Sequence, residues 1–222
     1  MRPLLLAIAW LSFGVAHARA EYLYDNGPIN GTIGGFSVGR VFHVNSAGEE
    51  VKVSNSFTLE KDSILTGAQL GLWTHLEAAP VSLDWSIGTT PFGADMGFGT
   101  VNLNNTFHNL YGGRSAVHSS AFPLNTQLAS GAYWLTIEHA KATDGLKVFW
   151  DANKGPSSAF ISYVAPPEVL PIVSESFQIL GHEAIATPEP GSLTLIVIGI
   201  TGISACAWRR RENAKRRQDS CA

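Results

Sequence analysis

Alternation of apolar and polar residues is the feature that most constrains how this chain can fold. In residues 81–87, VSLDWSI, every second residue is apolar. Residues 131–138, GAYWLTIE, alternate in the same way and place Tyr133, Leu135 and Ile137 on one side. A period of two residues is typical of β-strands that bury one face and leave the other in water. The alternation therefore predicts strands with an apolar inner side.

The pattern recurs along residues 21–185, where no stretch sustains the period of 3.6 residues that a helix requires. Turn-forming clusters such as NSAGEE, GTTPFG and NKGPSS separate the apolar runs. Eight or nine short strands joined by turns predict an all-β, antiparallel sandwich of the jelly-roll kind. The further residues expected to point inward are Val51, Val53, Phe57, Leu59, Ala68, Leu70, Leu72, Phe177 and Ile179, with Val81, Leu83, Trp85 and Ile87 from the first run.

The first twenty residues have the composition of a secretory signal peptide. Arg2 supplies a positive start, residues 4–15 are apolar, and Ala18 and Ala20 form a small-residue cleavage site. The apolar run is too short for a permanent membrane anchor. We therefore expect residues 1–20 to direct the chain through the Sec translocon and to be removed by signal peptidase.

The part expected to be exported is acidic. Residues 21–187 hold seven lysines and arginines and fifteen acidic residues, a net charge of −8, although the whole chain carries only −3. This charge argues against nucleic acid as a partner. Both cysteines, Cys206 and Cys221, lie beyond this part, so its core must be stable without a disulfide. That favours a bacterial exported protein.

The chain closes on an apolar run and a basic cluster. Residues 193–208 carry no charge, and residues 209–211 are three arginines. With Gly191 and Ser192 the run approaches the length that spans a bilayer, and basic residues collect on the cytoplasmic side. These features predict a transmembrane helix, a body outside the membrane and a cytoplasmic basic tail at 212–222; a buried core helix is the alternative.

A rigid tripeptide precedes the apolar run. The prolines of Pro188-Glu189-Pro190 fix the backbone and prevent a helix from beginning there. We expect an extended, exposed segment at the outer membrane edge, which a membrane-embedded peptidase could grip.

In this order, the tripeptide, apolar run and arginines of residues 186–211 resemble the PEP-CTERM sorting signal of Gram-negative exported proteins. In that family an exosortase recognises the tripeptide and processes the tail. The resemblance implies transient anchorage in the inner membrane, with the body outside, and then delivery to the cell surface or to the exopolysaccharide of a biofilm. This chain departs from the family by running eleven residues past the arginines. The residues involved are Pro188, Glu189 and Pro190 for recognition and Arg209, Arg210 and Arg211 for membrane retention.

The body also resembles other exported proteins that carry this tail. The shared runs lie at residues 128–135, at 150–159 (WDANKGPSSA) and at 174–177 (SESF), and the likeness begins near YDNGPING. It implies the same β-sandwich and no activity, because a fold does not give a function.

Patterns that carry chemistry are weak in the body. Residues 35–39, GFSVG, match a nucleophile motif around Ser37, but no strand–turn–helix context surrounds it. Six scattered histidines form no metal-binding spacing. No pair of acids is singled out for glycoside hydrolysis. We therefore expect no catalytic residue, no cofactor and no metal, and a hydrolase is the third hypothesis.

Two features suggest a ligand. Asp151 and Asn153 begin a loop with oxygen ligands, but position twelve of an EF-hand would be Ser162, which leaves only a looser calcium site. Exposed tryptophans could stack on sugars, and alternation points Trp73 and Trp134 away from the apolar faces. A carbohydrate-binding module in the exopolysaccharide matrix is thus the alternative to a non-enzymatic surface protein. Its candidate residues are Trp73, Trp134, Trp150, Asp151 and Asn153.

Overall fold

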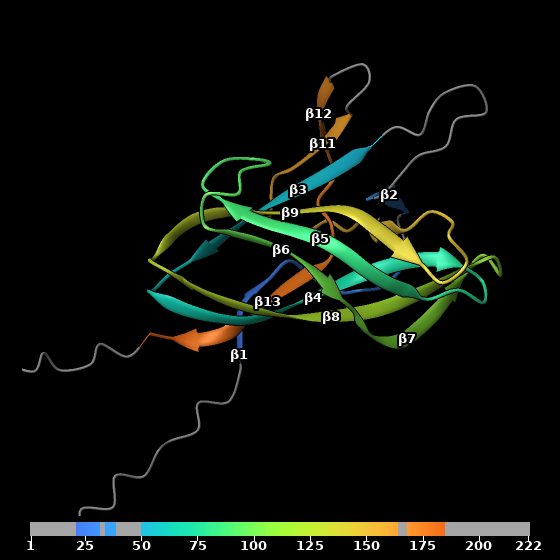
Figure 1. Ribbon diagram of the computed structural model, residues 1–222, viewed down its shortest axis with the longest axis horizontal. Helices are drawn as coiled ribbons and strands as arrows, with labels where there is room; N and C mark the ends of the chain where they lie inside the picture. Colours follow the sequence, from blue (N-terminus) through green and yellow to red (C-terminus); the bar gives the residue numbers. More distant parts are fainter. Residues whose placement is uncertain (1–20, 32–33, 39–49, 164–167, 185–222) are drawn as a thin grey trace, which may run out of the picture. The chain divides into compact units, whose positions relative to one another are not determined.

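The computed structural model describes residues 21–31, 34–38, 50–163 and 168–184, which form an all-β fold (Figure 1). Within these ranges there is no helix. The strands are β1 (Glu21–Asp25), β2 (Gly35–Ser37), β3 (Val51–Leu59), β4 (Ser63–His75), β5 (Pro80–Gly88), β6 (Gly97–Asn102), β7 (Asn104–Tyr111), β8 (Ser115–Leu128), β9 (Gly131–Ala142), β10 (Phe149–Asp151), β11 (Ala159–Tyr163), β12 (Glu168–Ile172) and β13 (Phe177–Glu183).

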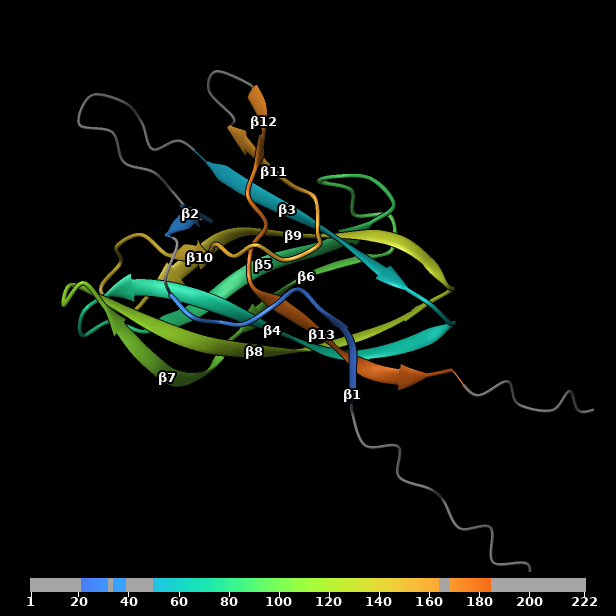
Figure 2. The ribbon, with the colours of Figure 1, turned by 180° about the vertical axis from the view of Figure 1, so that it is seen from behind.

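The strands form two antiparallel sheets. In the seven-stranded sheet, β4 is central and pairs with β8, β10 and β13, while β1, β2 and β7 extend it. The other sheet has six strands in the order β12-β11-β3-β9-β5-β6. Figures 1 and 2 show the sheets from opposite sides as two layers, an arrangement consistent with a β-sandwich.

The core lies between the layers and contains the predicted inward residues. From β4 of one sheet come Ala68, Leu70 and Leu72, all fully buried. From β9 of the other come Leu135 and Ile137, also fully buried, in the same apolar cluster. The prediction of alternating strands is confirmed for these segments. Burial of each of these leucine and isoleucine side chains contributes about 1.5–3 kcal/mol before chain entropy is counted.

Two positions and the number of strands depart from the prediction. Val81 was expected inward but is 41% exposed, because it lies at the start of β5, where the pairing with β9 is irregular. Asn55 occupies an inward position of β3 between Val53 and Phe57 and is fully buried. Strand number was also underestimated, since β2 and β10 have only three residues each, too few to show a period.

Several sequence-based expectations fall on residues that the structure does not describe. They are the signal peptide with Ala18 and Ala20, the tripeptide Pro188-Glu189-Pro190, the apolar run 193–208 and the arginines 209–211. In the part of the chain that is described, no helix has the length and apolarity to cross a membrane.

Candidate functional site

A β-bulge on the outer face of the six-stranded sheet sets the geometry of the candidate site. Ser82 of β5 faces Lys141 of β9, and Asp84 faces Glu138, so two steps along β5 match three along β9. His139 lies in this bulge with φ of 51°, in the left-handed region that non-glycine residues seldom adopt. Bulges often re-aim a side chain next to a binding or active site.

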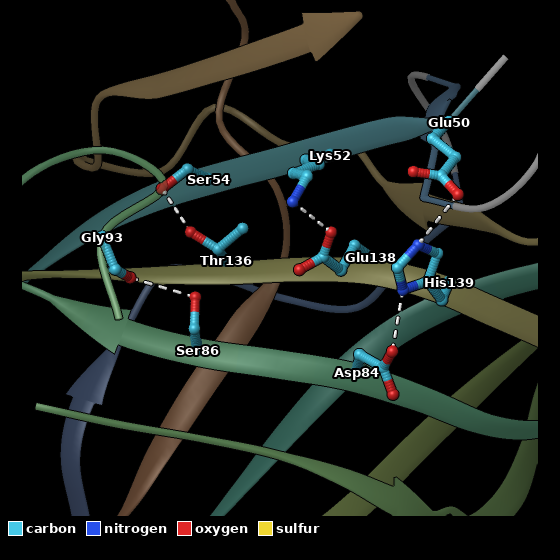
Figure 3. A network of polar contacts seen from close by, with 9 residues as sticks. All are labelled: Glu50, Lys52, Ser54, Asp84, Ser86, Gly93, Thr136, Glu138 and His139. Carbon is cyan, nitrogen blue, oxygen red and sulfur yellow. Dashed lines mark hydrogen bonds and ion pairs between the residues drawn. The ribbon is translucent and has the colours of Figure 1, made fainter. Parts of the chain in front are cut away.

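The bulge places the imidazole of His139 between two carboxylates (Figure 3). Its Nδ1 lies 2.7 Å from Oδ2 of Asp84, and its Nε2 lies 3.6 Å from Oε1 of Glu50. A carboxylate only accepts hydrogen bonds, so Nδ1 carries a proton and donates a hydrogen bond to Asp84. The three side chains are between a third and a half exposed, which leaves them open to a ligand.

Asp84 is held as an anion. Thr100 of β6 donates its hydroxyl to Oδ1 of Asp84 at 2.5 Å. Partial burial would raise the pKa of Asp84, but the hydrogen bonds from Thr100 and His139 outweigh it, and the pKa lies below its ordinary value. The site therefore has a stable negative charge at neutral pH.

A second ion pair lies beside the first. Nζ of Lys52 on β3 is 2.5 Å from Oε2 of Glu138 on β9. Lys52 and Glu138 adjoin the paired residues Val53 and Ile137, and Glu138 pairs with Asp84, so the charges form one row across three strands. We call this set of side chains the charged network; it consists of Glu50, Lys52, Asp84, Glu138 and His139. Beside it, a shallow hollow of about 360 Å³ is lined by Glu50, Asp84, His139, Ala140 and Lys141.

The β5–β6 loop covers the middle of the same face. Ser86 donates to the carbonyl of Gly93 at 3.0 Å, and the N–H of Phe92 donates to Oγ of Ser54 at 3.3 Å. Ser54 in turn accepts from Thr136 at 3.0 Å, and both hydroxyls are buried. Figure 3 shows the Ser86–Gly93 and Ser54–Thr136 contacts beside the charged network. The loop thus leaves the network as an open part of this face.

Beyond the loop, an aromatic pair lies on the same face. Trp134 of β9 and Phe160 of β11 have ring centroids 5.6 Å apart. Both side chains are half-buried. Trp134 is four residues from Glu138, about 13 Å along an extended strand, so the two could contact successive units of a long ligand.

A separate group of polar side chains is buried inside the domain. The carboxylate of Asp151 accepts four hydrogen bonds: Oδ1 from Nε1 of Trp73 at 2.8 Å, and Oδ2 from the N–H groups of Asn30 and Gly31 at 3.1 and 3.2 Å and from the hydroxyl of Ser176 at 3.1 Å. These donors come from three distant segments. Asp151 therefore joins β4, the segment after β1 and the start of β13.

Two asparagines extend these contacts. The amide of Asn153 donates to the carbonyl of Asn26, whose own amide donates to the carbonyl of Glu175. The hydroxyl of Ser174 donates to Oδ1 of Asn153 at 2.8 Å. We call the buried set the polar hub; its members are Asn26, Asn55, Asp151, Asn153, Ser174, Glu175 and Ser176.

The polar hub brings together the runs YDNGPING, WDANKGPSSA and SESF, which lie far apart in the sequence. Gly155, in the second run, illustrates how closely they approach: a Cβ there would lie 2.1 Å from the carbonyl oxygen of Asn26. These runs therefore have a structural role, which is to close the domain.

Contacts in and around the polar hub contradict most of the ligand-binding roles that were expected from the sequence. Trp150 is fully buried, and its Nε1 donates to the carbonyl of Ser176 at 2.9 Å. Trp73 does point away from Leu72, but Ile29 and Tyr111 pack against it and leave it 7% exposed. The oxygens of Asp151 and Asn153 are occupied by N–H and O–H donors, which leaves no free ligand set for calcium. Of the tryptophans proposed for sugar binding, Trp134 alone keeps an exposed part.

Sequence reasoning missed the charged network. Glu50, Asp84 and His139 are separated by dozens of residues, and a bulge leaves no trace in the apolar pattern. The left-handed backbone of His139 is a property that only the structure reveals.

The remaining sequence motifs add no chemistry in the described ranges. There, no three residues of the types His, Cys, Asp and Glu converge as a metal site requires. Ser37 lies in β2, and its hydroxyl has no hydrogen-bond partner. Comparison with protein-family models, with curated proteins and with solved structures finds no match to this chain.

Proposed function

We propose that this chain is an exported, non-enzymatic cell-surface or extracellular-matrix protein, sorted through its Pro188-Glu189-Pro190 tripeptide by an exosortase-like membrane peptidase. The observation that carries the proposal is the order of the tripeptide, the uncharged run and the arginines, together with the signal-peptide composition of residues 1–20. Each part is common alone, but the ordered set is specific to a sorting tail.

The positions of the described strands are compatible with this division of the chain. The first described strand begins at Glu21, directly after the expected cleavage site at Ala20, and the last ends at Glu183, shortly before Pro188. Neither cysteine lies between these limits. Such a body would fold outside the cell without a disulfide and remain intact when both ends were removed.

The experiment replaces the central residue of the tripeptide. Glu189→Ala is expressed as the full chain in a Gram-negative host that encodes an exosortase, and the mature mass and membrane fraction are measured. We expect the variant to keep its tail and stay in the membrane, whereas the wild type and a Glu168→Ala control are processed. Equal processing of Glu189→Ala and wild type would reject the recognition role. Recovery of the wild type from the cytosol with both ends intact would reject export.

A second candidate function is carbohydrate binding, and the outer face of the six-stranded sheet favours it. The charged network offers both donors and acceptors beside an open hollow. The Trp134–Phe160 pair offers an apolar surface on the same face. Neutral polyhydroxylated chains need this combination of paired hydrogen-bonding groups and flat rings.

A glycan array with the full chain in mild detergent tests this candidate. We expect Trp134→Ala to weaken binding of any retained polysaccharide about tenfold, as loss of one stacked ring does. Tyr22→Ala serves as the control, because Tyr22 is 62% exposed and lies on β1, in the other sheet. Absence of binding to every polysaccharide would remove this candidate and leave the sorting proposal untouched.

A further inference from the structure

Glu175 is a fully buried acid whose carboxyl group has no partner. It is among the largest side chains with no exposed surface, and neither Oε1 nor Oε2 forms a hydrogen bond in the structure. Its backbone, by contrast, is fixed in the polar hub: its N–H donates to Oδ1 of Asn55 at 3.0 Å, and its carbonyl accepts from Asn26. The position of the side chain is therefore set by the fold.

The charge around Glu175 is of the wrong sign to stabilise a carboxylate. The charged group that acts on it is Asp151, a second acid, whose carboxylate accepts four hydrogen bonds. The other titratable group at the hub is Tyr24 of β1, which donates its hydroxyl to Asn26 at 3.2 Å. The members contributed by β3 and by the segment 174–176, which are Asn55, Ser174 and Ser176, carry no charge.

No basic side chain offsets the charge within the described ranges. The lysine ion pairs there join Lys52 to Glu138 and Lys61 to Glu183, and His139 pairs with Asp84 and Glu50, so none of them involves a member of the hub. Burying an isolated carboxylate is costly, and such a group takes up a proton instead. Burial, reinforced by the charge of Asp151, raises the pKa of Glu175 well above its ordinary value.

A buried cation is the other way to balance this charge, and the contacts argue against it. Every carboxylate oxygen of Asp151 already faces N–H or O–H donors. Oδ1 of Asn55 accepts from Glu175 N–H, so the remaining group of Asn55 is an NH₂ donor, and it too lacks a partner. Donors without partners favour a neutral acid or water over a metal ion.

We infer that the folded domain holds one proton on the side chain of Glu175, and that this proton keeps the polar hub closed. Removing it places a second negative charge in the same buried region as Asp151. The charge can be solvated only if the contacts of Asn26, Asn55 and Asp151 open. The hub is thus a pH-sensitive lock that holds the segment after β1 and the start of β13 onto the sandwich.

The direction of the effect follows from proton linkage. A carboxyl group that binds its proton more tightly in the folded chain gives stability that is complete below its unfolded pKa, and this stability is lost as pH rises toward the folded pKa. Across that interval the folding equilibrium constant falls by about tenfold per pH unit through this group alone. Asp84 and Asp95, whose pKa values lie below the ordinary value, act in the opposite direction.

The test compares wild type, Glu175→Gln and the matched control Glu168→Gln, each as the full chain in mild detergent, by urea unfolding from pH 4.5 to 9. Glu168 is exposed on β12. We expect Glu175→Gln to gain stability relative to wild type as pH rises, by up to about tenfold in the folding constant per pH unit. The control should follow wild type. A difference between Glu175→Gln and wild type that is constant with pH would overturn the inference.

A second measurement uses the wild type alone, so it does not depend on whether a variant folds. Infrared spectroscopy of the wild type at neutral pH should show the C=O stretch of a protonated carboxyl group that does not exchange readily with deuterated water. Amide exchange at Asn26 and Gly31 should accelerate at high pH by more than the intrinsic base-catalysed increase that all amides show. Absence of that band, or a loss of stability on adding a metal chelator, would show that a cation or an ionised carboxylate occupies the site instead and would reject the proton lock.

Discussion

The side chains of Trp73 and Asp151 meet through a hydrogen bond of 2.8 Å between Nε1 and Oδ1, although 78 residues separate them in the chain. Trp73 belongs to β4, the central strand of its sheet, and Asp151 ends β10, which pairs with β4. The bond lies on the side of β4 opposite Leu72 and so outside the apolar core. Two sets of contacts therefore hold the sandwich together: the apolar core between the sheets, and the polar contacts of the hub, which are made by different residues.

The first prediction concerns the four hydrogen bonds that Asp151 accepts. In Asp151→Asn one oxygen is replaced by an NH₂ group, which would face N–H or O–H donors instead of accepting from them. We expect the free energy of unfolding to fall by about 2–4 kcal/mol, because buried donors lose their partner. Urea unfolding of the full chain measures this. Asp144→Asn, in an exposed turn, is the control; equal losses in both variants would contradict the role given to the hub.

The second prediction concerns the close approach at Gly155. An added Cβ would lie 2.1 Å from the backbone oxygen of Asn26, which cannot move aside as a flexible side chain can. We expect Gly155→Ala to lower the free energy of unfolding by about 1–3 kcal/mol or more. Gly99→Ala is the matched control, since its Cβ would meet Trp85 at an ordinary 3.4 Å. The unfolding temperature of Gly155→Ala should lie clearly below that of Gly99→Ala. Similar unfolding temperatures would show that the backbone of the hub can shift to accommodate the added Cβ.

Sequence alternation predicted the core faces because they depend on local spacing. Leu70, Leu72, Leu135 and Ile137 lie inward as the period of two requires. The exposure of Trp73 was predicted wrongly although its direction was right, because the residues that cover it, Ile29 and Tyr111, come from distant segments. Alternation tells which face a residue takes and cannot tell what packs on that face.

The candidate site was harder to predict from the sequence than the core faces. His139 faces Asp84 because one extra residue in β9 shifts the register, and nothing in the letters EHAK marks that position. The runs WDANKGPSSA and SESF were visible as shared runs, but their meeting in the hub depends on strand pairing across the whole domain. These polar runs therefore hold distant segments of the domain together. From the sequence, Trp150, Asp151 and Asn153 in the first run had been interpreted as part of a calcium or sugar site.

The third prediction concerns pH and His118. Burial lowers the pKa of His118, and its hydrogen bond to the carbonyl of Ala78, at 3.1 Å, only partly opposes this. A histidine with a lowered folded pKa gives stability that is complete above about pH 6.5 and is lost as pH falls toward the folded pKa. We expect wild type to lose up to about 1.4 kcal/mol per pH unit relative to His118→Gln below pH 6.5. The exposed His75→Gln should follow wild type; parallel curves for His118→Gln and wild type would disprove the effect.

The last prediction separates the stability of the fold from the geometry of the candidate site. His139 adopts φ of 51°, which costs a non-glycine residue about 1 kcal/mol. Its exposed contacts with Asp84 and Glu50 stabilise the folded chain by a similar amount, about 0–1 kcal/mol. We therefore expect His139→Gly to unfold with nearly the wild-type free energy, because relief of the backbone offsets the lost contacts.

His139→Ala is the matched variant, since it loses the same contacts and keeps the unfavourable backbone. We expect it to be about 1 kcal/mol less stable than His139→Gly in urea unfolding of the full chain. If the alanine variant were as stable as the glycine variant, the bulge would not be strained. In that case the left-handed backbone of His139 would give no evidence that this position is kept to aim an imidazole between two carboxylates.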